Sequence, residues 1–213
     1  MSSPEESDLA TVPSRALKLD RRRLRSERTR LAIIEAYLEL LRRDSVTPTA
    51  SHIADQAACS VRSIFERFSD LDGLRLAAAD YAIAQGQAEA VARNVDGDRP
   101  TRIHSHVETR ALACEKWLPL WRIIAIQNRV AELKTRVAMV RLANIERMKL
   151  IYRLELSCLP EPAREQVLTA LSVLISFESW DQMRHCFGHS MEAAQGVWRS
   201  AIDRMLPSAG EIQ

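Results

Sequence analysis

The densest group of residues with chemical potential lies near the N-terminus and is basic. Residues 13–30 contain eight arginines and lysines and two acidic residues, a net charge of +6, whereas the whole chain carries +2. Guanidinium groups bind phosphates through paired hydrogen bonds and displace counterions from nucleic acids. We therefore expect Arg21, Arg22, Arg23 and Arg25 to contact the backbone or the minor groove of a nucleic acid.

Two other interpretations of this basic run remain open. It could be a solvated polar tail, or it could contact an acidic membrane surface. A membrane anchor needs apolar side chains, and Leu24 is the only one among residues 21–25. A nucleic acid is therefore the expected partner, and no membrane association is expected.

The histidines and cysteines form no recognisable metal site or activated nucleophile. His185 and His189 are four residues apart, but Gly188 lies between them and the glutamate of an H-E-x-x-H zinc motif is missing. His104 and His106 have no partner motif, and the chain lacks nucleophile-elbow, P-loop and dinucleotide-binding patterns. The cysteines form no C-x-x-C pair. We expect no enzyme activity, no metal and no cofactor.

The composition indicates a helical, globular protein. Of the 213 residues, 46% are hydrophobic and 27% are charged, which suits a soluble fold with its own core. The chain has only 6 glycines and 8 prolines, so tight turns are few and helices are favoured over sheets. The N-terminus lacks the apolar segment of a signal peptide, and the most apolar stretch, 168–177, is too short to span a bilayer. A cytoplasmic location is the simplest expectation.

The elements that would position the basic residues form a small head. Apolar residues recur at helical spacing over about 24–42, and the pattern breaks at 44–48. Short helices are predicted over 49–57 and 61–68, followed by a long helix over 71–93. Two short helices joined by a tight turn and braced by a longer helix are typical of a helix-turn-helix unit, whose second helix reads the major groove of DNA.

The stretch from residue 49 to residue 74, TASHIADQAACSVRSIFERFSDLDGL, resembles the head of TetR-family transcriptional regulators. The family's pattern is T-x-x-x-I-A-x-x-A-G-V-S-x-x-T-x-Y-x-H-F-x-x-K-x-x-L. The outright matches are Thr49, Ile53, Ala54, Ala57, Ser60, Phe68 and Leu74, and the near-matches are Ser63 and Phe65. So many fixed spacings make the signal specific, and the resemblance covers residues 25–75, roughly a quarter of the chain.

This resemblance implies which residues would bind DNA. Those expected to face base edges, at the start of the second helix of the motif, are Val61, Arg62 and Ser63. Those expected to contact phosphates are Thr49, Ser60 and Arg67, with Phe65 at the position of the family's tyrosine. The chain departs from the family at Phe65, which has no hydroxyl, at Leu71, where a lysine is usual, and at Ala58, where the turn usually has glycine. These departures affect the expected contacts rather than the expected fold.

Beyond the head the pattern is helical to the end of the chain. Turn signals divide it into predicted helices over 101–117, 119–127, 129–156, 163–186 and 191–206. We therefore predict an all-α fold of about nine helices, similar in count to the family. The predicted division is a flexible arm over 1–20, a DNA-binding head over 21–75 and a larger ligand-binding and dimerisation body over 76–213.

For the body, the resemblance implies a dimer and a ligand cavity. Family members generally dimerise through their last two long helices, and the residues expected there are Leu168, Leu171, Leu174, Ile175 and Ala201. The residues expected to line a cavity for a small-molecule effector are His104, Trp117, Trp121, Met148, Tyr152, Phe177 and Trp180. Ordinary core packing is the alternative for each of these residues taken singly.

The sequence therefore predicts a homodimeric, ligand-responsive transcriptional regulator, most simply a repressor of a near-palindromic operator. The alternative is a helical small-molecule-binding or enzymatic protein whose head serves assembly rather than DNA reading. Sequence-selective DNA binding that weakens steeply with salt belongs only to the first.

Overall fold

The computed structural model describes residues 14–44, 47–126 and 131–207, which form ten α-helices and one π-helical turn. No strand occurs within these ranges, so the predicted all-α fold is confirmed, with a helix count close to that expected. No helix there combines the length and the apolar composition that a membrane crossing requires. The elements are α1 (Ser14–Asp44), α2 (Ala50–Gln56), α3 (Val61–Phe68), α4 (Leu71–Glu89), α5 (Arg99–Ile126), α6 (Ala131–Ile151), α7 (Arg153–Ser157), α8 (Glu161–Leu174), α9 (Phe177–Asp181), η1 (Gln182–Cys186) and α10 (Met191–Met205).

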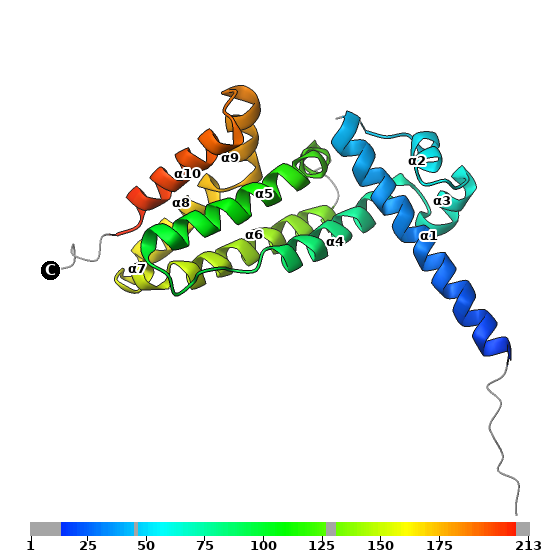
Figure 1. Cartoon of the computed structure of the whole chain (residues 1–213), viewed down its shortest axis with the longest axis horizontal. Coiled ribbons are helices and arrows are strands. Elements are labelled where there is room, and N and C mark those ends of the chain that lie inside the picture. Colours follow the sequence, from blue (N-terminus) through cyan, green and yellow to red (C-terminus); the bar gives the residue numbers. More distant parts are fainter. Residues whose placement is uncertain (1–13, 45–46, 127–130, 208–213) are drawn as a thin grey trace, which may run out of the picture.

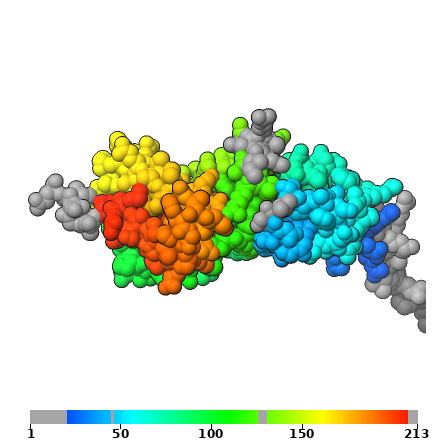
Figure 2. Space-filling view, turned by 90° about the horizontal axis from the view of Figure 1, so that it is seen from above, coloured from blue at the N-terminus to red at the C-terminus, as the bar shows by residue number. Residues whose placement is uncertain are grey.

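The molecule is elongated, with a small head at one end and a larger helical bundle at the other. The head consists of α1, α2 and α3, and α4 runs from it into the bundle formed by α5 to α10 (Figure 1). The head and the carboxy-terminal helices occupy opposite ends in the space-filling view (Figure 2). Helix α4 contacts α1 and α3 on one side and α5 and α6 on the other, so it joins the two parts.

Helix α1 is longer than predicted. It begins at Ser14 rather than near Leu24, so residues 14–20 of the expected flexible arm are helical, whereas residues 1–13 lie outside the described ranges. The buried face of α1 begins only at Ile33, and residues 21–28 are exposed. The apolar pattern thus marks where the helix packs, whereas arginine, lysine and leucine, which have high helix propensity, extend it further.

The two short helices of the head begin at the predicted capping residues. Thr49 Oγ1 accepts a hydrogen bond from the His52 N–H at 3.3 Å, and Ser60 Oγ accepts one from the Ser63 N–H at 3.1 Å. Each cap satisfies one of the N–H groups that a helix start leaves without an intrahelical partner. The helix-turn-helix geometry is therefore encoded locally at both helix starts.

The turn between α2 and α3 has a left-handed residue. Ala58 has φ of 48°, a region that glycine adopts without steric cost, and the Cys59 N–H donates to the Ala54 carbonyl at 3.0 Å to close the turn. The two helices then meet over a shared core in which Ile53 and Ile64 are fully buried. The small side chain of Ala54 allows this close crossing.

Helix α4 begins in a crowded turn. Asp70 Oδ1 accepts a hydrogen bond from the Gly73 N–H at 2.7 Å, which caps the helix. A side chain at position 73 would collide with the Phe68 carbonyl, so the turn requires glycine there. The end of α3 and the start of α4 are thereby fixed relative to each other.

Helix α5 continues through a proline that was expected to separate two helices. Pro119 lies inside the helix, whose bounds are Arg99 and Ile126. A proline in a helix interior costs about 3 kcal/mol because its N–H is missing and its ring crowds the preceding turn. Here the flanking Leu118 and Leu120 are both buried in the core, and their packing offsets that cost. The predicted helix end at 127 lies outside the described residues.

The predicted helix over 163–186 is broken into α8, α9 and η1. Helix α8 ends at Leu174, and Ser176 caps α9 by accepting a hydrogen bond from the Ser179 N–H at 3.1 Å. The chain then widens into the π-helical turn, in which the Phe187 N–H donates to the Gln182 carbonyl. Apolar periodicity alone did not reveal this break, because Ile175 and Phe177 are both buried on either side of it.

A buried ion pair connects α5 with α7. Arg102 Nη1 and Nη2 donate to the two carboxylate oxygens of Glu155 at 2.9 and 2.5 Å, and Nη1 also donates to the Ile151 carbonyl at 2.6 Å. Burial is the largest influence and raises the pKa of Glu155, but the hydrogen bonds and charge of Arg102, a backbone hydrogen bond and the charge of Arg99 together outweigh it and hold that pKa below its usual value. This end of the bundle is therefore held by a buried ion pair.

Candidate functional site

The exposed surface of the reading helix α3 starts at its first residues. Val61 and Phe65 are 37% and 43% exposed, and the side chain of Arg62 is 87% exposed. Ile64 and Phe68 point the other way and are buried in the head core. Three side chains predicted to contact DNA therefore lie together in solvent on one helix.

Arg62 is held by a weak partner. Its Nε donates to Glu66 Oε1 at 2.8 Å, one turn further along the helix. An exposed pair of this kind contributes only about 0–1 kcal/mol, so it can exchange for a stronger acceptor. Only Nε is engaged by the described residues, which leaves the terminal nitrogens available for two parallel hydrogen bonds, as guanine accepts at O6 and N7.

The predicted phosphate-contacting hydroxyls already have structural roles. Thr49 and Ser60 cap α2 and α3, and Ser60 Oγ also hydrogen bonds to Ser63 Oγ at 3.1 Å. Ser63 is accordingly half-buried rather than fully exposed. These groups remain predicted DNA contacts, but they are less free than Arg62.

Two other positions of the motif are turned towards the protein. Arg67 is half-buried, its Nη1 donates to the Ser63 carbonyl at 3.0 Å, and its Nε is buried with no partner among the described residues. Leu71 packs against the head core, so it provides no charge where the family has lysine. The phosphate contact predicted for Arg67 would therefore compete with its hydrogen bond to the helix.

The exposed first part of α1 carries the basic run. Arg21, Arg22, Arg23 and Arg25 are all exposed on a helix that extends past the rest of the head (Figure 1). At 100° per residue, Arg21, Arg22 and Arg25 lie on one side of the helix, whereas Arg23 points to the opposite side. Only part of the run can face a single ligand surface at one time.

The second candidate site is a cavity of about 110 Å³ inside the bundle. Helices α4, α5 and α6 line it, together with Phe177 of α9. Most of its wall is apolar and includes Ile83 from α4, Trp117 and Trp121 from α5, and Val140 from α6. Concave apolar sites with a few polar groups are typical of small-molecule binding.

The structure corrects four of the seven residues expected to line this cavity. Trp117, Trp121 and Phe177 do line it. His104 is exposed on α5, because it lies two residues, or about 200°, from the lining residue His106. The other three expected residues are buried in the core away from the cavity and are Met148, Tyr152 and Trp180.

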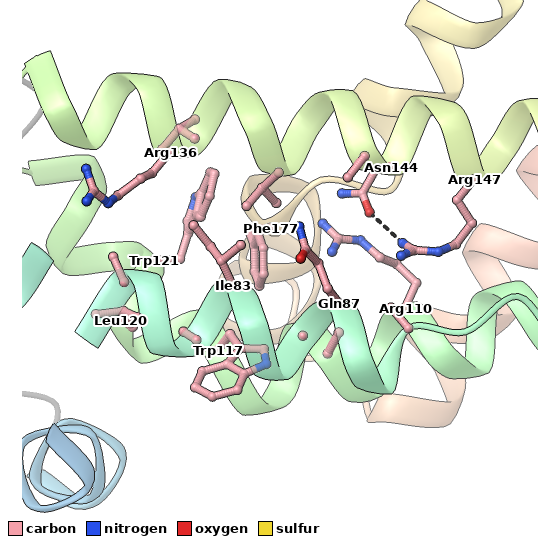
Figure 3. Close-up of a pocket in the computed structure, with 18 of the residues that line it drawn as sticks. Ile83, Gln87, Arg110, Trp117, Leu120, Trp121, Arg136, Asn144, Arg147 and Phe177 are labelled. Atoms are coloured by element: carbon pink, nitrogen blue, oxygen red, sulfur yellow. Dashed lines mark hydrogen bonds between the residues drawn. The ribbon is translucent and has the colours of Figure 1, made fainter. Parts of the chain in front are cut away.

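One end of the cavity is polar and contains two arginines. Arg110 Nε donates to the Ile175 carbonyl at 2.8 Å, and Arg147 Nη1 donates to Asn144 Oδ1 at 3.0 Å. Figure 3 shows both guanidinium groups at this end of the cavity, close to Asn144. His106 adjoins them, and its Nδ1 is 2.7 Å from the Tyr152 hydroxyl.

These charges change the titration of their neighbours. Burial lowers the pKa of Arg147, and the charge of Arg110 lowers it further. Burial, then Arg110 and Arg147, lower the pKa of His106 to about 3, so His106 is neutral at physiological pH. Positive charge is therefore already concentrated here, and another proton is unfavourable.

Sequence reasoning did not identify these polar lining residues, although a signal was present. His106, Arg110, Ala113 and Trp117 recur every three or four residues along α5, which places them on one face. Arginines on such a face are usually solvated, so their burial could be recognised only after α4 and α6 were placed over it.

Three of the residues expected at a dimer interface are buried within the protomer. Leu168, Leu171 and Ile175 are at most 5% exposed, and Leu174 is half-buried. They belong to the core that includes Trp198 and Ile202 of α10, because α8 and α10 pack on each other first. The half-buried Ala201 of α10 remains at the edge of this contact.

The outward faces of α8 and α10 carry residues other than those predicted for the dimer interface. Val173 of α8 is 67% exposed and Val197 of α10 is 44% exposed. Small residues surround them on these faces, namely Thr169, Ala170, Ala193 and Ser200. A second copy of the chain could approach this surface closely.

The histidine cluster near η1 makes an ordinary surface contact. His185 Nδ1 is 2.9 Å from Asp181 Oδ1, one turn earlier in the chain. Among the residues described, no three histidine, cysteine or acidic side chains are placed to hold a metal ion.

Comparison with known proteins gives matches in structure rather than in sequence. No family model and no curated protein matches the sequence. A crystal structure from Rhodococcus sp., of a protein assigned to the TetR family of transcriptional regulators, aligns with a TM-score of 0.64 at 16% identity, covering 84% of this chain and 100% of that one.

The multidrug-binding protein EbrR gives two further matches. Its complex with imidazole aligns with a TM-score of 0.60 at 14% identity, covering 85% of this chain and 91% of that chain. Its complex with malachite green aligns with a TM-score of 0.52 at 15% identity, covering 84% and 98%. At this identity the likeness is one of fold: the chain has the fold seen in TetR-family regulators, along almost the whole length of those proteins.

Proposed function

We propose that this protein is a homodimeric, ligand-responsive transcriptional regulator, most simply a repressor that binds a near-palindromic operator in the cytoplasm. The observation that carries the proposal is the exposed start of α3, where Val61, Arg62 and Phe65 face solvent from a capped helix. This helix belongs to a helix-turn-helix unit within a fold shared with a structure assigned to the TetR family.

In this proposal the head, residues 21–75, docks α3 in the major groove. Arg62 leaves Glu66 and donates to guanine, and Val61 and Ser63 contact neighbouring base edges. The helix starts at Thr49 and Ser60, together with Arg67, would face phosphates, and the basic run of α1 would reach the backbone or the minor groove. Phe65 would pack against the sugar-phosphate backbone without the hydrogen bond that tyrosine provides.

The dimer would form through the outward faces of α8 and α10 around Val173 and Val197, with Leu174 and Ala201 at its edge. Two heads related by a two-fold axis would enter successive major grooves about 34–36 Å apart. Because one protomer's head covers only half of such a site, the two half-sites would be inverted repeats.

The cavity in the body, residues 76–213, would hold the effector. Helix α4 supports such a response, because Leu74 is buried in the head core whereas Ile83 and Gly86 line the cavity. Trp117 lines the cavity and also a second hollow at the junction of α1, α4 and α5. A ligand that displaces α4 would change the spacing of the two heads and release the operator.

The test is selection of duplexes from a random pool by the purified protein at about 0.15 M salt, a physiological ionic strength. We expect an enriched inverted repeat whose binding weakens steeply as salt increases. A folded dimer that enriches no sequence, even at lower salt, would overturn the proposal. It would favour a ligand-binding or enzymatic protein whose head serves assembly.

A further inference from the structure

We propose that the cavity binds an organic anion, with an apolar or aromatic body beside Trp117 and Trp121 and a carboxylate group at Arg110 and Arg147. The inference specifies the effector of the proposed regulator and takes its biological role from that proposal. The binding reaction itself needs no DNA and can be tested separately.

Two of the three arginines that line the cavity, Arg110 and Arg147, have no counter-charge among the described residues. Arg110 is 8% exposed and Arg147 is half-buried, yet no carboxylate of the described residues lies within 4.0 Å of either guanidinium. Other arginines of the bundle are paired with acids, as in Arg102–Glu155, Arg122–Asp181 and Arg136–Asp80. Removing a charge from water without a partner is costly, so an anion bound between these two would be favoured.

The wall of the cavity as a whole favours an anion. Among the described residues that line it, none is acidic. Burial lowers the pKa of Arg147 and of His106, and the neighbouring arginine charges lower both further, so this end has a positive potential and no acidic side chain in its described lining. A cationic ligand would add to this repulsion, whereas an anion would relieve it.

Two indole rings of the lining add hydrogen-bond donors without partners among the described residues. Trp117 Nε1 and Trp121 Nε1 are buried and have no partner among the described residues. An indole N–H only donates, and so does a guanidinium. These lining groups are donors rather than acceptors, which favours an anion over a cation as the bound ligand.

The positions of the aromatic rings and the arginines also give a bound ligand an orientation. Trp121 stacks on Phe177 with ring centroids 4.7 Å apart. The Arg110 guanidinium also lies over the Phe177 ring, 4.6 Å from its centroid. Figure 3 shows Arg110 and Arg147 at one end and Arg136 at the other, with the aromatic rings between them. Since Arg136 is paired with Asp80, only the Arg110 end attracts a negative head group.

The experiment is calorimetric titration of the full chain, without DNA, at about 0.15 M salt. The probes are naphthalene and decyl compounds, each as the carboxylate, the neutral primary amide and the primary amine. We expect at least one carboxylate to bind about tenfold or more tightly than its amide, because charge-assisted hydrogen bonds are roughly twice as strong as neutral ones. The amines should bind most weakly.

Two variants show whether the arginines cause this preference. Arg147→Met keeps an unbranched apolar stem and removes the charge, so it should reduce the carboxylate-to-amide ratio severalfold while amide affinity changes little, with Arg110 providing the preference that remains. Arg141→Met is the matched control, because Arg141 lies on the same helix but is 59% exposed and outside the cavity. Thermal melting checks that both variants fold, and Arg147→Lys, which retains the charge, should keep the preference if Arg147→Met does not fold.

Several outcomes would overturn the inference. These are equal or tighter binding of the amides, tighter binding of the amines, no carboxylate binding at millimolar concentration, or equal losses in Arg147→Met and Arg141→Met. Operator selection without carboxylate binding would overturn this inference and leave the proposed function standing. Selective carboxylate binding without DNA selection would support this inference and overturn the regulator proposal.

Discussion

At the scale of single residues, Arg62 and His106 differ in how the fold uses their charge. Arg62 is exposed and its only described partner is the exposed Glu66, so its charge is available to a ligand. His106 is buried against two arginines and stays neutral. These different environments lead to a separate prediction for each residue.

Replacing Arg62 with alanine should reduce discrimination between operator and unrelated DNA rather than affinity for DNA in general. The loss of one bidentate guanine contact corresponds to about 1–3 kcal/mol of discrimination, or roughly 5- to 150-fold. Competition binding with operator and scrambled duplexes measures this ratio. Arg93→Ala, which changes an exposed arginine beyond α4, is the control and should leave the ratio unchanged. Full discrimination by Arg62→Ala would remove this residue from base reading.

His106 should make the protein less stable as pH falls below 6.5. Its folded pKa is about 3 against an ordinary value of 6.5, since burial, Arg110 and Arg147 all oppose the proton. Above pH 6.5 the group is neutral in both states and costs nothing. Between pH 6.5 and pH 3 only the unfolded state takes up the proton, so the free energy of unfolding falls by about 1.4 kcal/mol per pH unit.

Urea unfolding at pH 7 and pH 5 measures this effect. From the 6.5 crossover down to pH 5, the loss assigned to His106 amounts to roughly 2 kcal/mol. His106→Asn cannot titrate, so it should lose that much less stability than the unsubstituted protein over the same interval. Tyr152 faces the ring but ionises far above this range, because burial raises its pKa. Equal losses in both proteins would show that His106 is protonated in the folded state.

At the scale of elements, the turn of the head and the proline inside α5 show how packing overrides local preference. Ala58 adopts a left-handed conformation that alanine disfavours, because the capped helices on either side leave the chain no other path. Pro119 is likewise retained inside a helix because its neighbours are buried. In both places tertiary contacts compensate for an unfavourable residue.

Ala58→Gly should therefore stabilise the head. A left-handed non-glycine residue costs roughly 1–2 kcal/mol, whereas glycine loses about 0.5–1 kcal/mol through its greater freedom in the unfolded chain, which leaves a net gain of up to about 1.5 kcal/mol. Thermal unfolding measures it. Ala57→Gly, one residue earlier with a negative φ of −84°, is the control and should be destabilising. A lower melting temperature for Ala58→Gly would mean that the turn is not strained.

At the scale of the whole molecule, the two proposed sites lie apart and are joined by α4. The head is at one end, the cavity is in the bundle, and the exposed faces of α8 and α10 belong to the far end (Figures 1 and 2). Any two-fold contact there would fix the separation of the heads through the length of the bundle.

Val173→Glu combined with Val197→Glu should produce a folded monomer. Both valines are exposed on the surface that we assign to the dimer, and a charge on each would be buried without a partner in a symmetric contact. Sedimentation at micromolar concentration measures the change, and operator affinity should fall with it. Val91→Glu, an equally exposed valine after α4, is the control. A double variant that remains dimeric would place the interface elsewhere.

The sequence by itself determined the helical class, the head and its caps. Thr49 and Ser60 cap their helices by contacts that span three residues, and the buried pair Ile53 and Ile64 follows from helical spacing. These features are local, because hydrogen bonds and apolar faces within a turn or two of helix depend on residues close together in the chain.

Only the tertiary structure decided which apolar and charged side chains share a space. Leu171 was expected at a dimer contact and is in the core, because α10 covers it first, and His104 was expected in a cavity that His106 lines instead. Arg110 and Arg147 lie 37 positions apart on two helices, and nothing in their local sequence signals that they face one cavity whose described lining has no acidic residue. Burial of a charge depends on what packs over a helix face, and that is settled only when the helices are brought together.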